Sequence, residues 1–134
     1  MSALFLPVSF GEATDKLTIL ESKRERIADP AKLANIEAEL RSLQERLFEH
    51  TREVAQFPKL FDRLKAINAR LWDIEENIRS HERRGDFGAE FIRLARAVYT
   101  TNDERTRVKR ELDVVFGSTI FEEKSYVDHP PTDG

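Results

Sequence analysis

The chain has 134 residues, 22 Lys and Arg against 25 Asp and Glu, and no cysteine, so its formal net charge is −3. This length suits one domain. The absence of cysteine excludes disulfides and thiol chemistry and fits a reducing cytoplasm. The slightly negative charge gives no general attraction to nucleic acid or anionic lipid. No apolar run approaches the roughly 20 residues of a membrane span, and the first residues lack the basic region of a signal peptide, so we expect a cytoplasmic protein that does not enter a membrane.

The first helix is predicted over residues 10–27. Pro7 disfavours a helical conformation at the residue before it. Ser9 and Glu12 then form a capping box, in which the serine hydroxyl accepts a hydrogen bond from the Glu12 backbone N–H. Apolar residues follow at alternating three- and four-residue spacing, which is typical of an amphipathic helix; they are Phe10, Ala13, Leu17, Leu20 and Ile27.

Two long helices are predicted over residues 30–55 and 58–84. Asp29 suits the N-cap of the first, and Pro30 suits its first helical position. Apolar residues recur at heptad spacing in the first of them, apart from His50, and Leu and Ile also recur through the second. The boundary depends on Pro58, because a proline disfavours the helical conformation at the preceding residue. The alternative is one helix over 27–84 that is kinked at this proline, since no Gly, Asn or Asp marks a turn there. We favour the break.

A fourth helix is predicted over residues 87–116, between Gly85 and Gly117, which suit helix caps. The expected fold is all-α: an antiparallel bundle of four helices, one shorter N-terminal and three long. Residues 1–127 would form this single domain, and residues 128–134 a disordered tail. The expected core residues are Leu17, Leu20, Ile36, Leu40, Leu43, Leu64, Ile67, Leu71, Ile74, Phe91, Leu94, Val98, Val108 and Leu112.

Several kinds of catalytic and metal site have no matching motif in this sequence. Helical di-metal sites use a Glu followed three residues later by Glu or His, and no Glu here has either. The histidines at positions 50, 81 and 129 have no second histidine at helical spacing. A phosphate-binding Gly-rich loop and a Gly-x-Ser-x-Gly elbow are also missing from the sequence. We therefore expect no metal site and no cofactor.

Polar residues interrupt the apolar stripes of the first and fourth helices. Arg24 projects between Leu17, Leu20 and Ile27, and Arg105 falls among the apolar residues of the fourth helix. Asn102 and Lys109 border that face. On the third helix, the stripe is edged by Glu75 and Glu82 and flanked by Trp72 and Arg79.

Buried arginines require partners, because an unpaired buried charge is strongly unfavourable. One interpretation is an interior network of ion pairs, which we weigh more heavily; in it Arg105 lies close to Glu75 or Glu21. The other is a cationic pocket between the first, third and fourth helices that binds a small anion. A variant of the second interpretation is a small enzyme acting on a dianionic metabolite. Its substrate would be surrounded by Arg24, Arg79, Arg105 and Lys109.

Four stretches, residues 11–27, 71–82, 91–112 and 117–126, resemble an uncharacterised bacterial family of small helical proteins, known mainly as a domain of unknown function. Its members tend to occur with genes for glycosyltransferases and surface-polysaccharide or lipopolysaccharide biosynthesis. Ser22 and Arg24 depart from the family pattern. The matching residues are Glu12, Asp15, Lys16, Glu21, Lys23, Trp72, Glu75, Arg79, Arg96, Tyr99, Asn102, Asp103, Arg105, Lys109, Glu122, Glu123, Lys124 and Tyr126.

The resemblance implies an accessory helical module of a cytoplasmic glycan-assembly pathway. Its partner would be a protein of the glycosyltransferase pathway or a small anionic ligand. Nucleic acid is a minor alternative as a partner. A second copy of the chain, in a homodimer, is a further alternative. The resemblance also implies that the C-terminal segment folds back onto the bundle with Tyr126 docked. The candidate ligand-binding residues are Lys16, Glu21, Arg24, Trp72, Glu75, Arg79, Asn102, Arg105, Lys109 and Tyr126.

Overall fold

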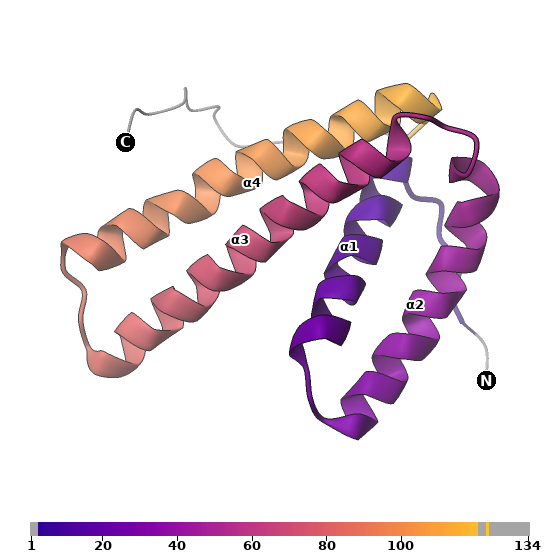
Figure 1. Ribbon diagram of the computed structural model, residues 1–134. Coiled ribbons are helices and arrows are strands. Elements are labelled where there is room, and N and C mark those ends of the chain that lie inside the picture. The colour runs from indigo at the N-terminus through magenta and orange to yellow at the C-terminus, as the bar shows by residue number, and fades with distance from the viewer. Residues whose placement is uncertain (1–2, 121–122, 124–134) are drawn as a thin grey trace.

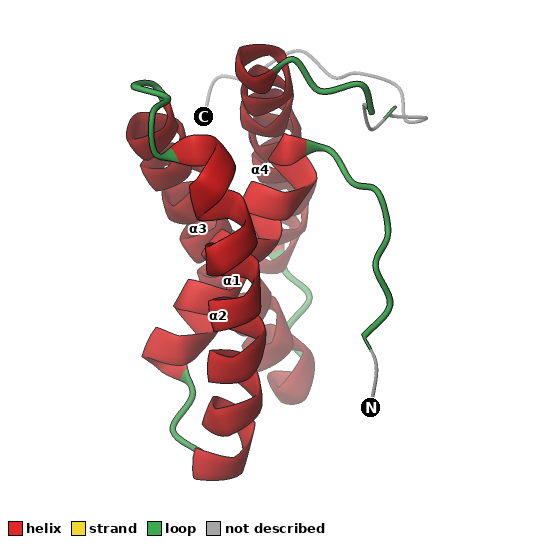
Figure 2. Cartoon of the chain, turned by 90° about the vertical axis from the view of Figure 1, so that its right-hand side faces the viewer, coloured by secondary structure: helices red, strands yellow, loops and turns green. Residues whose placement is uncertain are grey.

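The computed structural model describes residues 3–120 and 123, and within these residues the chain forms four α-helices and no strand (Figures 1 and 2). The all-α prediction is therefore confirmed. The shorter N-terminal helix and the three longer ones appear in the predicted order. They are α1 (Phe10–Arg26), α2 (Pro30–Thr51), α3 (Phe57–Arg84) and α4 (Ala89–Phe116).

Local caps fix four of the eight helix ends. The Ser9 hydroxyl accepts from the Glu12 N–H at 3.0 Å, and the Asp29 carboxylate accepts from the Ala31 N–H at 3.0 Å. Gly85 and Gly117 follow α3 and α4 with φ of 65° and 62°, a left-handed conformation that glycine adopts without steric cost. These are the positions at which the sequence predicts the starts and ends of helices.

The second and third helices are separate, as predicted, but two details of the boundary were wrong. α2 ends at Thr51 instead of residue 55, and Phe57 is already helical. Pro58 lies in the first turn of α3, where backbone N–H groups have no acceptor within the helix. The proline therefore costs no hydrogen bond, and the helix can begin one residue before it.

Two antiparallel hairpins build the bundle: α1 with α2, and α3 with α4 (Figure 1). α1 packs against all three other helices, whereas α2 packs chiefly against α1. The α1–α2 pair diverges from the α3–α4 hairpin, so the turn between α3 and α4 lies away from α1 (Figure 1). α1 is thus the element that joins the two hairpins.

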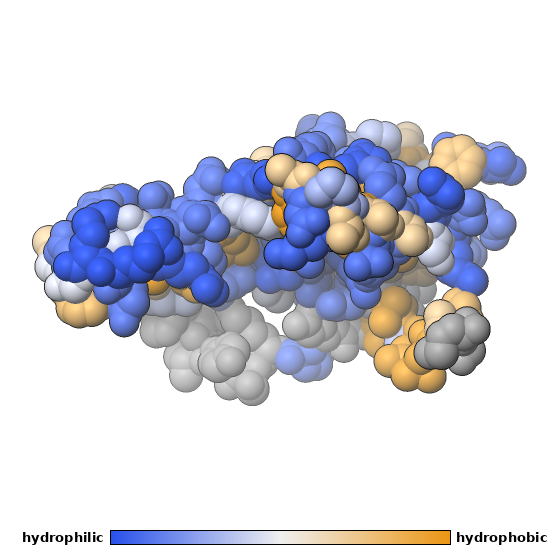
Figure 3. Space-filling view, turned by 90° about the horizontal axis from the view of Figure 1, so that it is seen from below, coloured by the Kyte–Doolittle hydropathy of each residue, from blue (hydrophilic) through white to orange (hydrophobic). Residues whose placement is uncertain are grey.

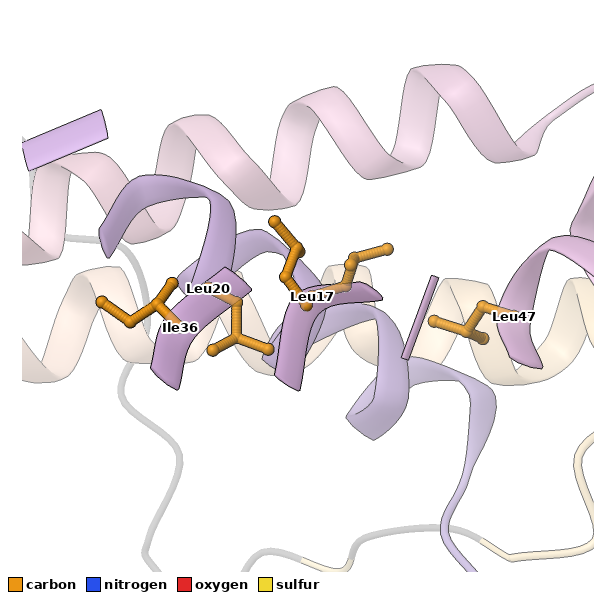
Figure 4. Packing of buried hydrophobic residues seen from close by; sticks show 5 residues of the cluster. Leu17, Leu20, Ile36 and Leu47 are labelled. Carbon is orange, nitrogen blue, oxygen red and sulfur yellow. The ribbon is translucent and has the colours of Figure 1, made fainter. Parts of the chain in front are cut away.

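The hydrophobic core has two parts, one in each hairpin. Leu17, Leu20 and Leu40 belong to the first, between α1 and α2 (Figure 4), and Leu64 and Leu112 to the second, between α3 and α4. Five predicted core residues are only half-buried: Leu43, Leu71, Ile74, Phe91 and Val98. Most of these lie in the part of the α3–α4 hairpin toward its turn, where few other side chains cover them. The other nine predicted core residues are buried.

α1 and α4 cross in close contact at Gly11. A Cβ added to this glycine would lie 2.3 Å from the Lys109 carbonyl oxygen, so only glycine fits without movement. The Gly11 N–H donates to the Asp113 carboxylate at 2.7 Å, and the Phe10 N–H donates to the Ser118 hydroxyl at 3.2 Å. The end of α4 therefore supplies acceptors for the unpaired amides at the start of α1.

Residues 3–8 and Glu123 lie outside the four helices. The extended segment of residues 3–8 exposes Leu4, Phe5 and Leu6, and this apolar surface contrasts with a largely hydrophilic face (Figure 3). At the other end, the Arg110 guanidinium contacts the Glu123 carboxylate at 3.4 Å, so the chain turns back beside α4 at Glu123. Tyr126 and the predicted tail, residues 128–134, lie outside the described residues. In the part of the chain described, no helix has the length and apolarity to cross a membrane.

Candidate functional site

An open groove of about 310 Å³ lies where α1, α3 and α4 meet. Five of its residues share one face of α3, at the spacing of successive helical turns. Two more lie one turn apart on α4, and one comes from α1. We call this site the Trp72 groove; its lining residues are Ile19, Asn68, Leu71, Trp72, Glu75, Glu76, Asn102 and Arg105.

The lining combines apolar and charged groups. Leu71 and Trp72 are half-buried and supply apolar surface, whereas the Glu75 and Glu76 side chains are exposed to solvent. Trp72 is the only tryptophan of the chain. A concave site with an aromatic side chain and a few charged groups is typical of binding sites in proteins.

The charge of Arg105 is compensated from behind the groove by Asp15 of α1. Arg105 Nε lies 2.9 Å from Asp15 Oδ1, and Arg105 Nη2 lies 2.5 Å from Asp15 Oδ2, so the pair is bidentate. Asp15 is only 2% exposed. Because a bidentate pair joins the two planar groups in one geometry, the Arg105 guanidinium is held in place and its charge is neutralised.

Asn68 extends this pair into a buried polar network. Its side-chain amide donates to Asp15 Oδ1 at 2.9 Å and to the Thr18 hydroxyl at 2.8 Å. The Thr18 hydroxyl in turn donates to the Asp15 carbonyl oxygen at 2.7 Å. Each polar group of the network therefore has the partner that burial requires.

The sequence predicted that Arg105 lies close to a carboxylate, and it does, but the expected partners, Glu75 and Glu21, were wrong. α1 runs antiparallel to α4 and crosses it closely at Gly11, beside Lys109. One helical turn further along α1, Asp15 therefore faces Arg105, which lies one turn earlier on α4. Glu21 lies farther along α1 and pairs with Lys65 of α3 at 3.2 Å.

Four predicted site residues meet in the groove: Trp72, Glu75, Asn102 and Arg105. Five others pair with charges elsewhere or at its edge: Lys16 with Glu39 at 2.8 Å, Glu21 with Lys65, Arg24 with Glu37 at 3.9 Å, Arg79 with Glu75 at 3.9 Å and Lys109 with Glu12 at 2.9 Å. Tyr126 lies outside the described residues. The structure thus brings one cation, Arg105, into the groove, and Arg24, Arg79 and Lys109 do not line it.

The placement of Arg24 in the centre of the apolar face of α1 was wrong. Its side chain is 39% exposed and reaches toward Glu37 of α2. α1 has two buried faces of different chemistry. Leucines pack against α2, whereas Gly11 and short polar residues face the α3–α4 hairpin; the buried polar ones are Thr14, Asp15, Thr18 and Ser22. Sequence reasoning missed this second face, whose signal is the recurrence of short polar residues at helical spacing.

Among residues 3–120 and 123, no group of three or more His, Asp or Glu is placed to hold a metal ion. Comparison of the chain with protein-family models, with curated proteins and with solved structures gives no match. The family resemblance therefore stays a prediction from the sequence.

Proposed function

We propose that this protein is a non-catalytic accessory module that binds another protein in the Trp72 groove. One observation carries the proposal: the single tryptophan of the chain lines an open groove, on the same helix face as two exposed carboxylates. Tryptophan is enriched among the side chains that contribute most binding energy at protein interfaces, where it fills or forms a pocket surrounded by polar residues.

The charges of the groove favour a protein contact over a small anion. Arg105 already has a bidentate carboxylate partner in Asp15, whereas Glu75 and Glu76 add negative charge at the rim. An anion in the groove would meet repulsion from these carboxylates. The same argument disfavours an enzyme that acts on a dianionic substrate, because such a substrate needs several cations around one site.

The family resemblance supplies the context of the proposal. It implies that the binding partner belongs to a bacterial surface-polysaccharide or lipopolysaccharide assembly pathway, in the cytoplasm. The accessory module would then hold or position a protein of that pathway, such as one that works with a glycosyltransferase. A groove formed by three helices presents a fixed surface for this purpose.

Photocrosslinking in cells tests the proposal. Trp72 is replaced by p-benzoylphenylalanine, which keeps an aromatic side chain in the groove, and Gln44 on the exposed side of α2 is replaced likewise as the control. We expect position 72 to crosslink to one protein that position 44 does not reach, and mass spectrometry identifies its pathway. Equal labelling at both positions, or no protein adduct at position 72, would contradict protein binding in the groove.

A further inference from the structure

We propose that the Trp72 groove takes an arginine side chain of the partner protein, with the guanidinium stacked on the Trp72 ring and hydrogen-bonded to Glu75 and Glu76. This inference rests on the proposed function, since it names the chemical group that the partner inserts. It is carried by three features of the groove: its charge, its aromatic ring and the geometry of its carboxylates.

The first feature is the excess of negative charge. The charged lining residues are Arg105, Glu75 and Glu76, and Asp15 pairs with Arg105 from behind. Within the described residues, Glu76 has no ion-pair partner, and Glu75 has only a contact of 3.9 Å with Arg79, whose side chain is 72% exposed. A cation from a partner would therefore find carboxylates that no close ion pair occupies.

The second feature is that Trp72 already attracts a guanidinium. The Arg26 guanidinium carbon lies 5.2 Å from the centroid of the Trp72 ring, within the range of a cation–π interaction. Arg26 is not among the residues that line the groove, and it also pairs with Asp73 at 2.8 Å. The ring thus contacts an arginine of its own chain that does not line the groove, and we expect the part of the ring that lines the groove to offer the same chemistry to a partner.

The third feature selects arginine over lysine. Glu75 and Glu76 lie next to each other on α3 and three to four residues after Trp72, so both carboxylates are within one turn of the ring. A planar guanidinium stacks on an aromatic face and donates several hydrogen bonds at its edge at the same time, whereas an ammonium group cannot do both. Leu71 and Ile19 offer apolar surface to the methylene stem of the arginine.

The test uses N-acetyl-arginine amide as the probe and the fluorescence of Trp72, the only tryptophan, as the signal. The neutral isostere N-acetyl-citrulline amide is the matched control ligand. We expect the arginine probe to give a saturable change in fluorescence and in the NMR shift of the Trp72 indole N–H. The citrulline probe should bind about tenfold more weakly, which corresponds to the loss of one charge-assisted interaction.

Paired variants then locate the effect. Glu75→Gln with Glu76→Gln removes both rim carboxylates, whereas Glu45→Gln with Glu49→Gln removes two exposed carboxylates of α2 and makes the same change in net charge. All four side chains are exposed, so both variants are expected to fold. Arginine binding should be lost in the first variant and retained in the second. Equal affinity for citrulline, equal loss in both variants, or no response of either signal to the arginine probe would overturn the inference.

This test separates the inference from the proposed function. If position 72 crosslinks to a protein but the arginine probe gives no response, the groove binds a partner through another group, and only the inference fails. If N-acetyl-glutamate amide or inorganic phosphate binds in place of arginine, the groove is an anion site, which contradicts the inference. If arginine binds and no protein is crosslinked, the groove has the predicted affinity for a guanidinium group, but the proposed function fails, and with it the assignment of this group to a partner protein.

Discussion

The carboxylate of Asp15 is almost completely buried. Its negative charge would destabilise the fold without the ion pair to Arg105. Arg105→Met should lower the free energy of unfolding by about 3 kcal/mol, because it leaves a buried charge without its partner. Adding Asp15→Asn should restore most of this loss, since the variant pair has no charge and the asparagine oxygen still accepts from Asn68. Urea unfolding of the two variants measures the difference. Equal stability of the single and double variants would show that the ion pair does not stabilise the fold.

Gly11 is expected to be as restrictive as a core residue, although it contributes no side chain. Gly11→Ala places a Cβ against the Lys109 carbonyl oxygen and should cost about 1–3 kcal/mol, because the backbone of α1 must shift away from α4. The matched control is Gly88→Ser, where the added Cβ meets only the Asp86 side chain at 3.4 Å and serine suits the N-cap. Thermal unfolding of both variants checks this, and equal melting temperatures would contradict the close crossing.

Two leucines of α3, two helical turns apart, differ in how much they contribute to the core. Leu64 is 0% exposed and contacts residues of α4, whereas Leu71 is half-buried beside the groove. Leu64→Ala should cost about 2–5 kcal/mol, and Leu71→Ala clearly less, because the second leaves a space that solvent can enter. The sequence pattern alone does not distinguish the two leucines. Chemical denaturation of each variant tests the ranking, and a larger loss for Leu71→Ala would reverse it.

Lys65 links α3 to α1 through Glu25 and Glu21, at 2.6 and 3.2 Å. The hydrogen bond to Glu25 raises the pKa of Lys65, opposed by burial, and Lys65 lowers the pKa of Glu25. A raised lysine pKa stabilises the fold while the lysine is protonated, and this contribution disappears as the pH rises through the folded-state pKa. A lowered glutamate pKa stabilises the fold while the glutamate is ionised, and this contribution disappears as the pH falls through the folded-state pKa.

Lys65→Met should therefore reduce stability most between the ordinary pKa values of Glu and Lys, 4.5 and 10.5. Toward lower and higher pH, the difference between this variant and the natural chain should shrink. Urea unfolding of both proteins near pH 3, 7 and 11 measures the difference. A difference that stays constant with pH would mean that the methylene stem of Lys65, and not its charge, joins the helices.

The helices were predictable because their signals are local. Ser9, Asp29, Gly85 and Gly117 each act within a few residues of the helix end that they define, and the apolar spacing between them needs no tertiary information. The exceptions are the end of α2, where no glycine or asparagine marks the boundary, and the start of α4, which lies at Ala89 instead of residue 87. At the end of α2, the apolar periodicity continues through Val54 to Phe57, beyond the last helical residue, Thr51.

The composition of the groove was only partly predictable, because it depends on how the helices cross. Apolar periodicity identified the face of α1 that packs against α2, but the face toward α3 and α4 is made of short polar residues. The partner of Arg105 follows from the close contact at Gly11, which aligns two helices that are far apart in the sequence. Neither the choice of Asp15 over Glu21 nor the exposure of Arg24 could be read from spacing within one helix.

At the scale of the whole molecule, the α1–α2 hairpin packs against the α3–α4 hairpin through α1, and a groove of net negative charge lies where α1, α3 and α4 meet. Trp72 makes this claim measurable, since it is the only tryptophan and lines the groove. The most direct test compares quenching of its fluorescence by caesium and by iodide, each relative to neutral acrylamide, at constant ionic strength. A negative groove concentrates cations, so caesium should quench relatively more than iodide, and Glu75→Gln with Glu76→Gln should remove the difference. Stronger relative quenching by iodide would show that the groove attracts anions, which would contradict the account.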